Sequence, residues 1–371
     1  MIAAQGELRG QGGRMTVDGD GGPATGAAVR SQEQGPSTRA GAPGSDPRTV
    51  VGALTYKRPD DLRAALPMLV EQAALLDPPA QVLVVDNDPE GGARDVVEDL
   101  ARRSAADGGP VVRYAHEPEP GIAAARNRAF DECADADVLV FIDDDERPVP
   151  TWLRLLVDTY LLDRPEAVVG PVVSEYEQEP DAWVTAGRFF DRRRLPTGTV
   201  TDVAATNNLL LDLHRVRALG LRFDERFGLS GGSDQLLTRQ LAQAGGRLVW
   251  CDEAVVVDVV PPDRVTRRWV LARAYRNGNT WGRTSVVLAD GALGRTVARA
   301  RITGQGLVRA AGGAARLAFG TVTGSLAHQA KGRRTYARGT GMIAGAYGTV
   351  YVEYARDGRR TVRSGKVPGA S

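Results

Sequence analysis

Cysteine and histidine are scarce in this sequence, and the glycine-rich loops of several nucleotide-binding families are missing. Cys133 and Cys251 fall in segments expected to form a helix and a strand, so we expect reduced core thiols rather than a disulfide framework. The three histidines show no metal-ligand spacing. No GxGxxG follows the first expected strand, and no glycine-rich stretch precedes Lys-Ser or Lys-Thr. These absences argue against dinucleotide-binding and P-loop enzymes.

Long apolar runs are missing too. The first 48 residues are rich in Gly, Ala, Ser, Pro and Gln and contain no aromatic residue. We therefore expect residues 1–48 to be disordered and not to act as a secretory signal. The longest uncharged stretches near the C-terminus, 317–330 and 339–352, have 14 residues each, fewer than the roughly 20 that span a bilayer. The sequence predicts a cytoplasmic protein without a membrane-spanning helix.

Charge is divided unevenly along the chain. Residues 265–371 carry 19 Lys and Arg against 3 Asp and Glu, a net charge of +16, whereas residues 1–264 carry 28 against 43, a net charge of −15. A basic tail of this kind indicates an anionic partner, with lipid headgroups or nucleic acid as candidates. Because no nucleic-acid-binding motif is present and the main body is acidic, we expect no nucleic-acid partner. We expect residues 265–371 to form helices, although their many glycines disfavour long helices.

Apolar strand-like runs alternate with amphipathic helical patterns through residues 49–264. Strands that are apolar throughout and separated by helices are typical of a mainly parallel sheet covered on both faces. We expect residues 167–173 to form one such strand. Ligands bind such sheets beyond the carboxyl ends of the strands. The polar clusters at the expected strand ends are therefore predicted to converge on one edge: "TYKRP", "DND", "HEPEPG" and "DDDERP".

Three consecutive aspartates, Asp143, Asp144 and Asp145, follow the buried run "VLVFI". Adjacent carboxylates repel one another unless a positive group lies among them. Carboxylate oxygens suit Mg²⁺ or Mn²⁺, which bind through one or two carboxylates while substrate phosphates complete the coordination. A solvated acidic turn with helix-capping aspartates is the alternative interpretation.

Several motifs, in order along residues 49–285, together resemble those of glycosyltransferase family 2, a family of inverting transferases with the GT-A fold. They are "VVGALTYKRP", "VLVVDND", "EPEPGIAAARNRAF", "VLVFIDDDERPVPTWL", "FDERFGLSGGSDQLLTRQLAQAGGRLVW" and "AVVVDVVPPDR". The resemblance implies an α/β GT-A domain over 49–264, with a mainly parallel sheet and helices on both faces, followed by a basic helical C-terminal region over 265–371. It also implies a nucleoside-diphosphate sugar donor and a Mg²⁺ or Mn²⁺ cofactor.

By this resemblance the first strand ends bind the nucleotide, and Asp143 and Asp145 are metal ligands. The residues implied in nucleotide-sugar binding are Thr55, Tyr56, Arg58, Asp86, Arg126, Asp143 and Asp144. From the residues alone, Asp86 is equally a turn residue and Arg126 a surface helix arginine.

Asp234 matches the family's catalytic base, which removes a proton from the acceptor hydroxyl. Read from its position alone, Asp234 or Ser233 is equally a cap of the helix that begins there. The chain departs from the family at two places: Ser233 stands where a Glu often precedes the base, and Asp258 stands where many members carry a histidine near the metal. Since carboxylate and imidazole both bind Mg²⁺ or Mn²⁺, Asp258 is a candidate third ligand.

The segment "RRWVLARAYRNGNTWGR" places Trp269, Ala272 and Tyr275 near one helical face, beside arginines. Such a helix either lies on an anionic membrane or packs on the catalytic domain. The expected function is inverting, metal-assisted transfer of a hexose-type sugar to a carbohydrate, lipid-linked or small-molecule acceptor, with peripheral contact at the inner face of the cell membrane. A non-catalytic GT-A module and a nucleotidyltransferase are the alternatives. The first loop, "LTYKRP", lacks the glycines of a nucleotidyltransferase.

Overall fold

The computed structural model describes residues 46–351 and 361–363. These residues all belong to one compact unit. The segment expected to be disordered, 1–48, lies outside the described residues apart from its last three positions.

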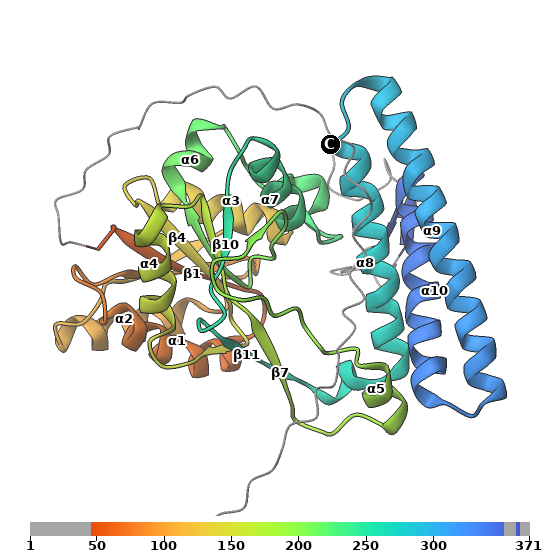
Figure 1. Cartoon of the computed structure of the whole chain (residues 1–371). Helices are drawn as coiled ribbons and strands as arrows, with labels where there is room; N and C mark the ends of the chain where they lie inside the picture. Colours follow the sequence, from red (N-terminus) through yellow and green to blue (C-terminus); the bar gives the residue numbers. More distant parts are fainter. Residues whose placement is uncertain (1–45, 352–360, 364–371) are drawn as a thin grey trace, which may run out of the picture. The chain divides into compact units, whose positions relative to one another are not determined.

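An eight-stranded sheet, in the order β3-β2-β1-β4-β9-β6-β10-β8, forms the centre of the described residues (Figure 1). Its strands are β1 (Thr49–Thr55), β2 (Gln81–Asp86), β3 (Val112–His116), β4 (Val138–Asp143), β6 (Ala167–Val169), β8 (Val200–Thr201), β9 (Asn208–Asp212) and β10 (Leu248–Trp250). The pairs β1-β2, β2-β3, β1-β4 and β6-β10 are parallel, while β9 runs antiparallel to β4 and β6, and β8 to β10. The mainly parallel sheet expected from the sequence is confirmed.

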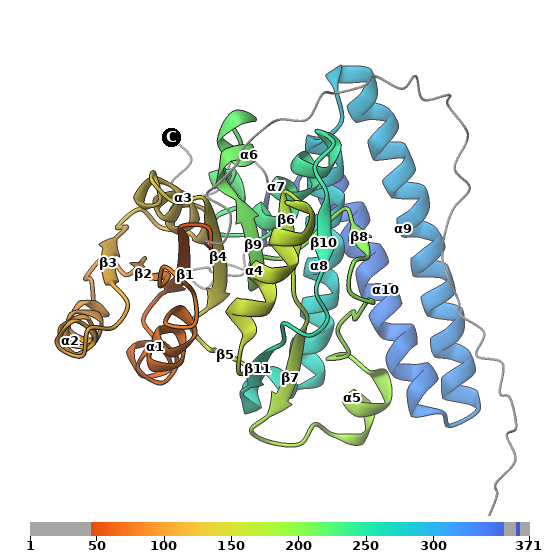
Figure 2. The same ribbon diagram turned by 60° about the vertical axis from the view of Figure 1, so that its left-hand side comes forward.

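Helices cover both faces of this sheet (Figure 2). One face carries α1 (Pro59–Ala73), α2 (Arg94–Ala106) and α4 (Trp152–Asp163), and the other carries α3 (Ile122–Glu132), α6 (Leu213–Ala218) and α7 (Ser233–Gln243). Successive strand residues point to opposite faces. In β1, accordingly, Val51 and Ala53 pack on the first layer, and Val50 and Leu54 on the second. Both layers are apolar, which explains the continuously apolar strands.

A smaller sheet lies beside the first and consists of β5 (Glu146–Pro148), β11 (Val256–Val260) and β7 (Val172–Tyr176). The expectation of one strand over residues 167–173 is wrong, because β6 and β7 belong to different sheets and separate at Gly170. A Cβ at Gly170 would lie 2.2 Å from the Asn208 side chain and 2.3 Å from the Ala254 carbonyl oxygen. Antiparallel pairing of β5 with β11 sets Asp258 opposite Glu146.

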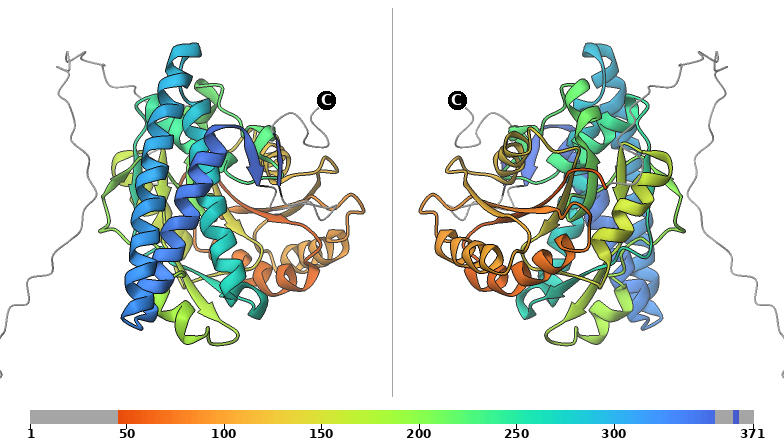
Figure 3. Two further views of the ribbon diagram at one scale, coloured as in Figure 1. Left: turned by 90° about the vertical axis from the view of Figure 1, so that its right-hand side faces the viewer. Right: turned by 90° about the vertical axis from the view of Figure 1, so that its left-hand side faces the viewer.

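Three helices follow, α8 (Arg267–Val287), α9 (Gly291–Val322) and α10 (Leu326–Ala346), and lie side by side (Figure 3). The expectation that the many glycines disfavour long helices is wrong, since α9 has 32 residues. Glycines occupy the helix contacts instead: a Cβ on Gly313 would lie 2.5 Å from the Tyr336 backbone nitrogen. In the described residues no helix is both long and apolar enough to cross a membrane.

Shorter elements complete the described chain. They are α5 (Ala182–Gly187), two 3-10 helices at Glu225–Phe227 and Pro262–Val265, and the hairpin of β12 (Thr349–Tyr351) with β13 (Thr361–Arg363). Helix α5 packs against α10.

Candidate functional site

The carboxyl ends of β1, β2 and β4 meet at one edge of the large sheet, as the sequence predicts. The strand register pairs Thr55 with Asp86, and Leu54 with Asp143. The polar residues that follow these strands are therefore neighbours in space.

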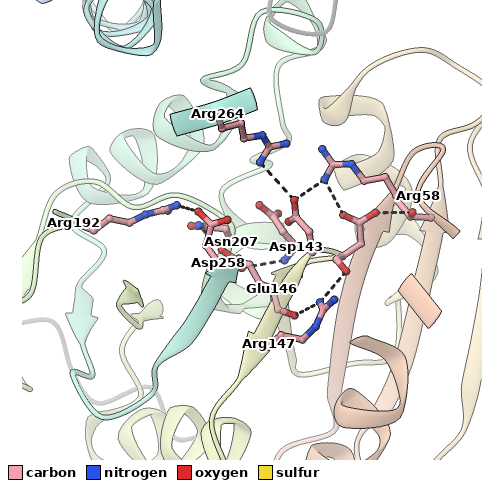
Figure 4. A network of polar contacts seen from close by, with 11 residues as sticks. Arg58, Asp143, Glu146, Arg147, Arg192, Asn207, Asp258 and Arg264 are labelled. Atoms are coloured by element: carbon pink, nitrogen blue, oxygen red, sulfur yellow. Dashed lines mark hydrogen bonds and ion pairs between the residues drawn. The ribbon is translucent and has the colours of Figure 1, made fainter. Parts of the chain in front are cut away.

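The first group of site residues consists of Thr55, Arg58, Asp144 and Asp145, which hydrogen bonds connect. Figure 4 shows Arg58 beside Asp143. The Thr55 hydroxyl donates to Asp144 Oδ2 at 2.7 Å, and Arg58 Nη1 donates to Asp145 Oδ2 at 2.6 Å and to Asp144 Oδ1 at 3.4 Å. Burial raises the pKa of Asp144 to about 6, although the Thr55 hydrogen bond and the Arg58 charge lower it. Arg264 lies 3.7 Å from Asp145 Oδ2 and adds a second positive charge.

The second group contains Asp143, Glu146, Asn207 and Asp258 (Figure 4). Asn207 Nδ2 donates to Glu146 Oε1 at 2.8 Å, and the Asp143 backbone N–H donates to Glu146 Oε2 at 3.3 Å. Burial and the nearby Asp145 raise the pKa of Asp143 to about 7. Burial and Asp143 raise the pKa of Glu146 well above its usual value. Glu146 is not among the site residues expected from the sequence, although it follows the three aspartates directly.

Asp258 lies opposite Glu146 in this group and pairs with an arginine. Arg192 Nη2 donates to Asp258 Oδ2. Arg192 comes from the segment after α5, whose irregular sequence gave no indication of which side chain would reach the site.

Two adjacent cavities open at this edge, of about 490 Å³ and 510 Å³. Thr55, Tyr56 and Arg58 line only the first cavity, together with Asp144 and Asp145. Asp234 lines only the second. Residues that line both are Ile122, Arg126, Asp143, Arg192, Asn207, Arg273 and Arg276. The cavities therefore adjoin at Asp143 and a group of arginines.

Arg126 and Asp234 come together through the start of α7. Arg126 is buried and donates to Ser233 Oγ at 2.9 Å, so it is no surface arginine. Gly232, in the left-handed conformation at φ 99°, is the N-cap of α7, and no side chain caps that helix. Asp234 Oδ1 accepts from the Gln235 backbone N–H at 2.7 Å. Neither Ser233 nor Asp234 is thus the helix N-cap, and the Asp234 carboxylate borders the second cavity.

Asp86 stands apart from the other expected site residues, because it lines neither cavity. It is fully buried and accepts from the Asp88 and Ala93 backbone N–H groups, each at 2.9 Å, and from the Tyr114 hydroxyl at 3.1 Å. These are the contacts of a strand-end turn residue. Asn87, the next residue, lines the first cavity instead.

The basic C-terminal region forms a wall of both cavities. Trp269, Arg273 and Arg276 of α8 line the first, and Arg273 and Arg276 also line the second. The Trp269 ring stacks on Phe190, with centroids 6.1 Å apart and an interplanar angle of 7°. Of the two roles left open for this helix, packing on the catalytic domain is the one observed. Burial lowers the pKa of Arg273 to about 9, as do the charges of Arg192 and Arg276.

The acidic residues of the first cavity suit a divalent cation. Among the described residues no three His, Cys, Asp or Glu side chains are grouped so as to hold a metal ion together. Asp145 and Asp258 are paired with arginines, whereas Asp143 forms no ion pair within this part of the chain. Mg²⁺ and Mn²⁺ bind through one or two carboxylates with substrate oxygens beside them. The buried carboxylates, whose pKa values are raised, offer hard oxygen ligands that such an ion would neutralise.

The sequence of this chain is similar to a known protein family and to a known protein. A sequence model described as "Glycosyl transferase family 2" matches residues 51–223. The chain is 34% identical over 246 residues to the succinoglycan biosynthesis protein ExoM of Rhizobium meliloti (strain 1021), a match that covers 65% of this chain and 76% of that protein.

Solved structures are similar as well. The mannosyltransferase PcManGT from Pyrobaculum calidifontis, in complex with GDP-Man and Mn²⁺, matches with a TM-score of 0.54 and 18% identity, over 82% of this chain and 89% of that one. GalNAc-T7 with UDP, GalNAc and Mn²⁺ matches with a TM-score of 0.46 and 13% identity. That match covers 64% of this chain and 51% of GalNAc-T7, so this chain spans about half of its length.

Proposed function

The chain belongs to glycosyltransferase family 2 and has the GT-A fold, and on that premise we propose that it transfers a hexose-type sugar from a nucleoside diphosphate to an acceptor hydroxyl, with inversion. The observation that carries this proposal is the pair of cavities that adjoin at Asp143. A donor in the first cavity and an acceptor in the second would bring the two reacting atoms together at that boundary.

The donor occupies the first cavity. Thr55, Tyr56 and Arg58 border it at the end of β1, where GT-A sheets bind nucleotides. PcManGT, which shares this fold, was solved with GDP-Man and Mn²⁺, which supports a nucleotide sugar as the donor here. Arg126 and Arg192 border both cavities, and guanidinium groups bind phosphate oxygens in pairs.

Asp143 and Asp145 would hold Mg²⁺ or Mn²⁺ against the donor diphosphate, with Asp258 as the third candidate ligand. A bound divalent cation neutralises the negative charge that develops on the departing diphosphate. Arg58 now pairs with Asp144 and Asp145. We expect this guanidinium to turn toward the diphosphate when the donor binds, because a phosphate offers it stronger hydrogen bonds.

Asp234 is the base of the transfer. The acceptor hydroxyl lies in the second cavity and loses its proton to an Asp234 carboxylate oxygen as its own oxygen bonds to the anomeric carbon. The bond from that carbon to the diphosphate oxygen breaks on the opposite side, and the electron pair leaves with the nucleotide. A single displacement of this kind inverts the anomeric configuration.

The physiological setting we propose is synthesis of a cell-surface polysaccharide, as the name of the 34% identical succinoglycan biosynthesis protein suggests. Glycolipid and natural-product glycosylation use the same chemistry. The protein would act in the cytoplasm, at the inner face of the cell membrane.

Helix α9 supports membrane contact. One exposed side of it is apolar along the whole helix, with residues spaced three and four apart. These residues are Leu293, Val297, Ala300, Gly304, Leu307, Val308, Ala311, Ala315, Ala318, Phe319 and Val322. Residues 291–351 contain nine Lys and Arg and no Asp or Glu. An apolar helix face with basic neighbours lies flat on anionic bilayers, so we place anionic lipid on this face.

Nucleotide titration tests the catalytic proposal. Purified protein is titrated by calorimetry with UDP, GDP, TDP and CDP, with and without Mn²⁺, and the titrations are repeated on Asp145→Ala. We expect one nucleotide to bind in a Mn²⁺-dependent manner and this binding to be lost in the variant. Asp60→Ala is the matched control, because its side chain is 92% exposed on α1. If no nucleotide binds, the non-catalytic alternative is favoured.

Membrane contact is tested by sedimentation with vesicles that contain phosphatidylglycerol or only phosphatidylcholine. The wild-type protein should sediment with the anionic vesicles, and Val308→Glu should weaken this at least about tenfold, since it places a charge in the apolar face. Val111→Glu introduces the same change at another exposed valine and should have little effect. Equal binding of both variants would rule out the α9 face.

A further inference from the structure

The two cavities differ in charge. The first is lined by six arginines and five carboxylates, so its charges nearly cancel. The second is lined by six arginines and only two carboxylates, Asp143 and Asp234; because Arg192 is already paired with Asp258, a formal charge of +3 remains. Like charges gathered around one cavity repel one another, and an anionic ligand would relieve that repulsion. A donor diphosphate in the first cavity would offset part of the charge of the shared arginines, but it would not reach Arg193 and Arg338, which line the second cavity alone.

Arg193 and Arg338 line only the second cavity. Arg193 donates to the Thr201 hydroxyl at 2.5 Å, and its guanidinium lies 5.5 Å from the Trp250 ring centroid. These contacts hold the side chain in place without neutralising it. In the described chain, neither Arg193 nor Arg338 forms an ion pair with a carboxylate, and the same holds for Arg273.

Arg338 belongs to α10, which is fixed against α8. A Cβ on Gly278 would lie 2.0 Å from the Arg338 carbonyl oxygen, so the two backbones are in direct contact there. The helix thus holds an exposed cation at the edge of the second cavity, where an anionic ligand can reach it.

We infer that the second cavity binds an acceptor that carries an oxyanion, a phosphate or a carboxylate, held by Arg193, Arg273 and Arg338. This inference rests on the proposed function, because it names the class of acceptor for the same site. Guanidinium forks match both kinds of oxyanion with paired hydrogen bonds. A neutral oligosaccharide would leave the excess positive charge of this cavity without a partner.

Three monosaccharides that differ in charge test the inference: glucose, glucose 1-phosphate and glucuronate. Each is titrated into the full-length protein with the preferred nucleoside diphosphate and Mn²⁺ at saturation, so that the first cavity is filled. We expect at least one charged sugar to bind about tenfold or more tightly than glucose, because hydrogen bonds between charged groups contribute strongly. Which one binds more tightly distinguishes a phosphate from a carboxylate on the acceptor.

Substitutions of single arginines test where the charged sugar binds. Arg193→Gln and Arg338→Gln should each weaken binding of the charged sugar about tenfold or more. Arg333→Gln removes the same charge from an exposed position of the same helix, outside both cavities, and should change it less than twofold. The wild-type comparison of the three sugars needs no variant, so misfolding of one does not block the test.

Two results would overturn the inference. Equal binding of charged and neutral sugars is one, and an equal effect of Arg333→Gln and Arg338→Gln is the other. In both cases nucleotide binding in the first cavity would leave the proposed function standing. If no nucleotide binds at all, the proposed function itself fails, so the two failures are distinguishable.

Discussion

Helices α8 and α10 touch through glycines, and replacing Gly341 by alanine tests what that contact contributes. The added Cβ would lie 2.1 Å from the carbonyl oxygen of Tyr275 in α8. This oxygen belongs to the backbone, so no rotamer change can relieve the clash. The helices would have to separate by more than about 1 Å to restore an ordinary contact of about 3.5 Å.

Two opposing effects decide the magnitude. Overpacking a tight contact costs about 1–3 kcal/mol, whereas alanine is better than glycine inside a helix by about 0.5–1 kcal/mol. We therefore expect Gly341→Ala to lower the free energy of unfolding by about 1–2 kcal/mol. Because α8 carries Arg273 and Arg276, a shift of 1 Å should also slow sugar transfer, on the order of tenfold to hundredfold.

Gly312→Ala is the matched control, since a Cβ at Gly312 of α9 would meet no atom within 4 Å. This variant keeps the gain in helix propensity without the clash and should be more stable by about 0.5–1 kcal/mol. Urea unfolding followed by circular dichroism measures both variants. The free energy of unfolding should decrease in Gly341→Ala and increase in Gly312→Ala. Equal stability of Gly341→Ala and Gly312→Ala would refute the close contact of α8 and α10.

Three further substitutions test the site and its support. Asp234→Asn should lower the transfer rate by about 10²–10⁴-fold, measured as nucleotide release, while calorimetric nucleotide affinity changes little. Asn208→Ala should destabilise the fold by about 3 kcal/mol in urea unfolding, because it leaves the Trp152 indole N–H and two backbone carbonyls without their partner. Asp137→Asn should lower stability at neutral pH by about 1 kcal/mol, with allowance for solvent screening. Burial alone would raise the pKa of Asp137, but hydrogen bonds from Arg48 and His214 outweigh it and lower that pKa to about 2 from 3.8. The stabilisation is therefore complete above pH 3.8 and is lost as pH falls through 2, so wild type and variant should converge on acidification.

Each of these predictions has a contradicting result. If Asp234→Asn transferred the sugar at the wild-type rate, Asp234 would not be the catalytic base. A small effect of Asn208→Ala would mean that water replaces the lost amide. A stability difference for Asp137→Asn that persists unchanged to low pH would show that the carboxylate charge is not its cause.

Much of the lining of the first cavity could be predicted from the sequence. Parallel strands bring their carboxyl ends to one edge, so Thr55, Arg58 and the aspartates 143–145 fall together once the alternation of strands and helices is recognised. Asp86 shows the limit of this reasoning. A strand-end carboxylate can point at a ligand or at its own turn, and only the contacts with Asp88, Ala93 and Tyr114 distinguish the two.

The arginines that line only the second cavity could not be predicted, because they come from segments without a diagnostic pattern. Arg192 and Arg193 lie in an irregular segment, and Arg338 lies more than 100 residues later in a glycine-rich helix. Glycine content alone predicted poor helices there. The contact of α8 with α10 reverses that inference, because glycine allows two helix backbones to approach where any side chain would separate them.

The division of the site between the two cavities has a consequence for how such an enzyme can change. Of the residues that border only the first cavity, all precede residue 223 except Leu229, Asp258, Val260, Arg264 and Trp269. Half of those that border only the second cavity follow residue 223, among them Asp234, Trp250, Thr280 and Arg338. The family match also ends at residue 223. A recombination event, or a designed chimera joined near that residue, could exchange half of the residues that line only the second cavity, Asp234 included, while most of those that line only the first are inherited intact. New glycosidic linkages could thus be made with the same nucleotide sugar as donor.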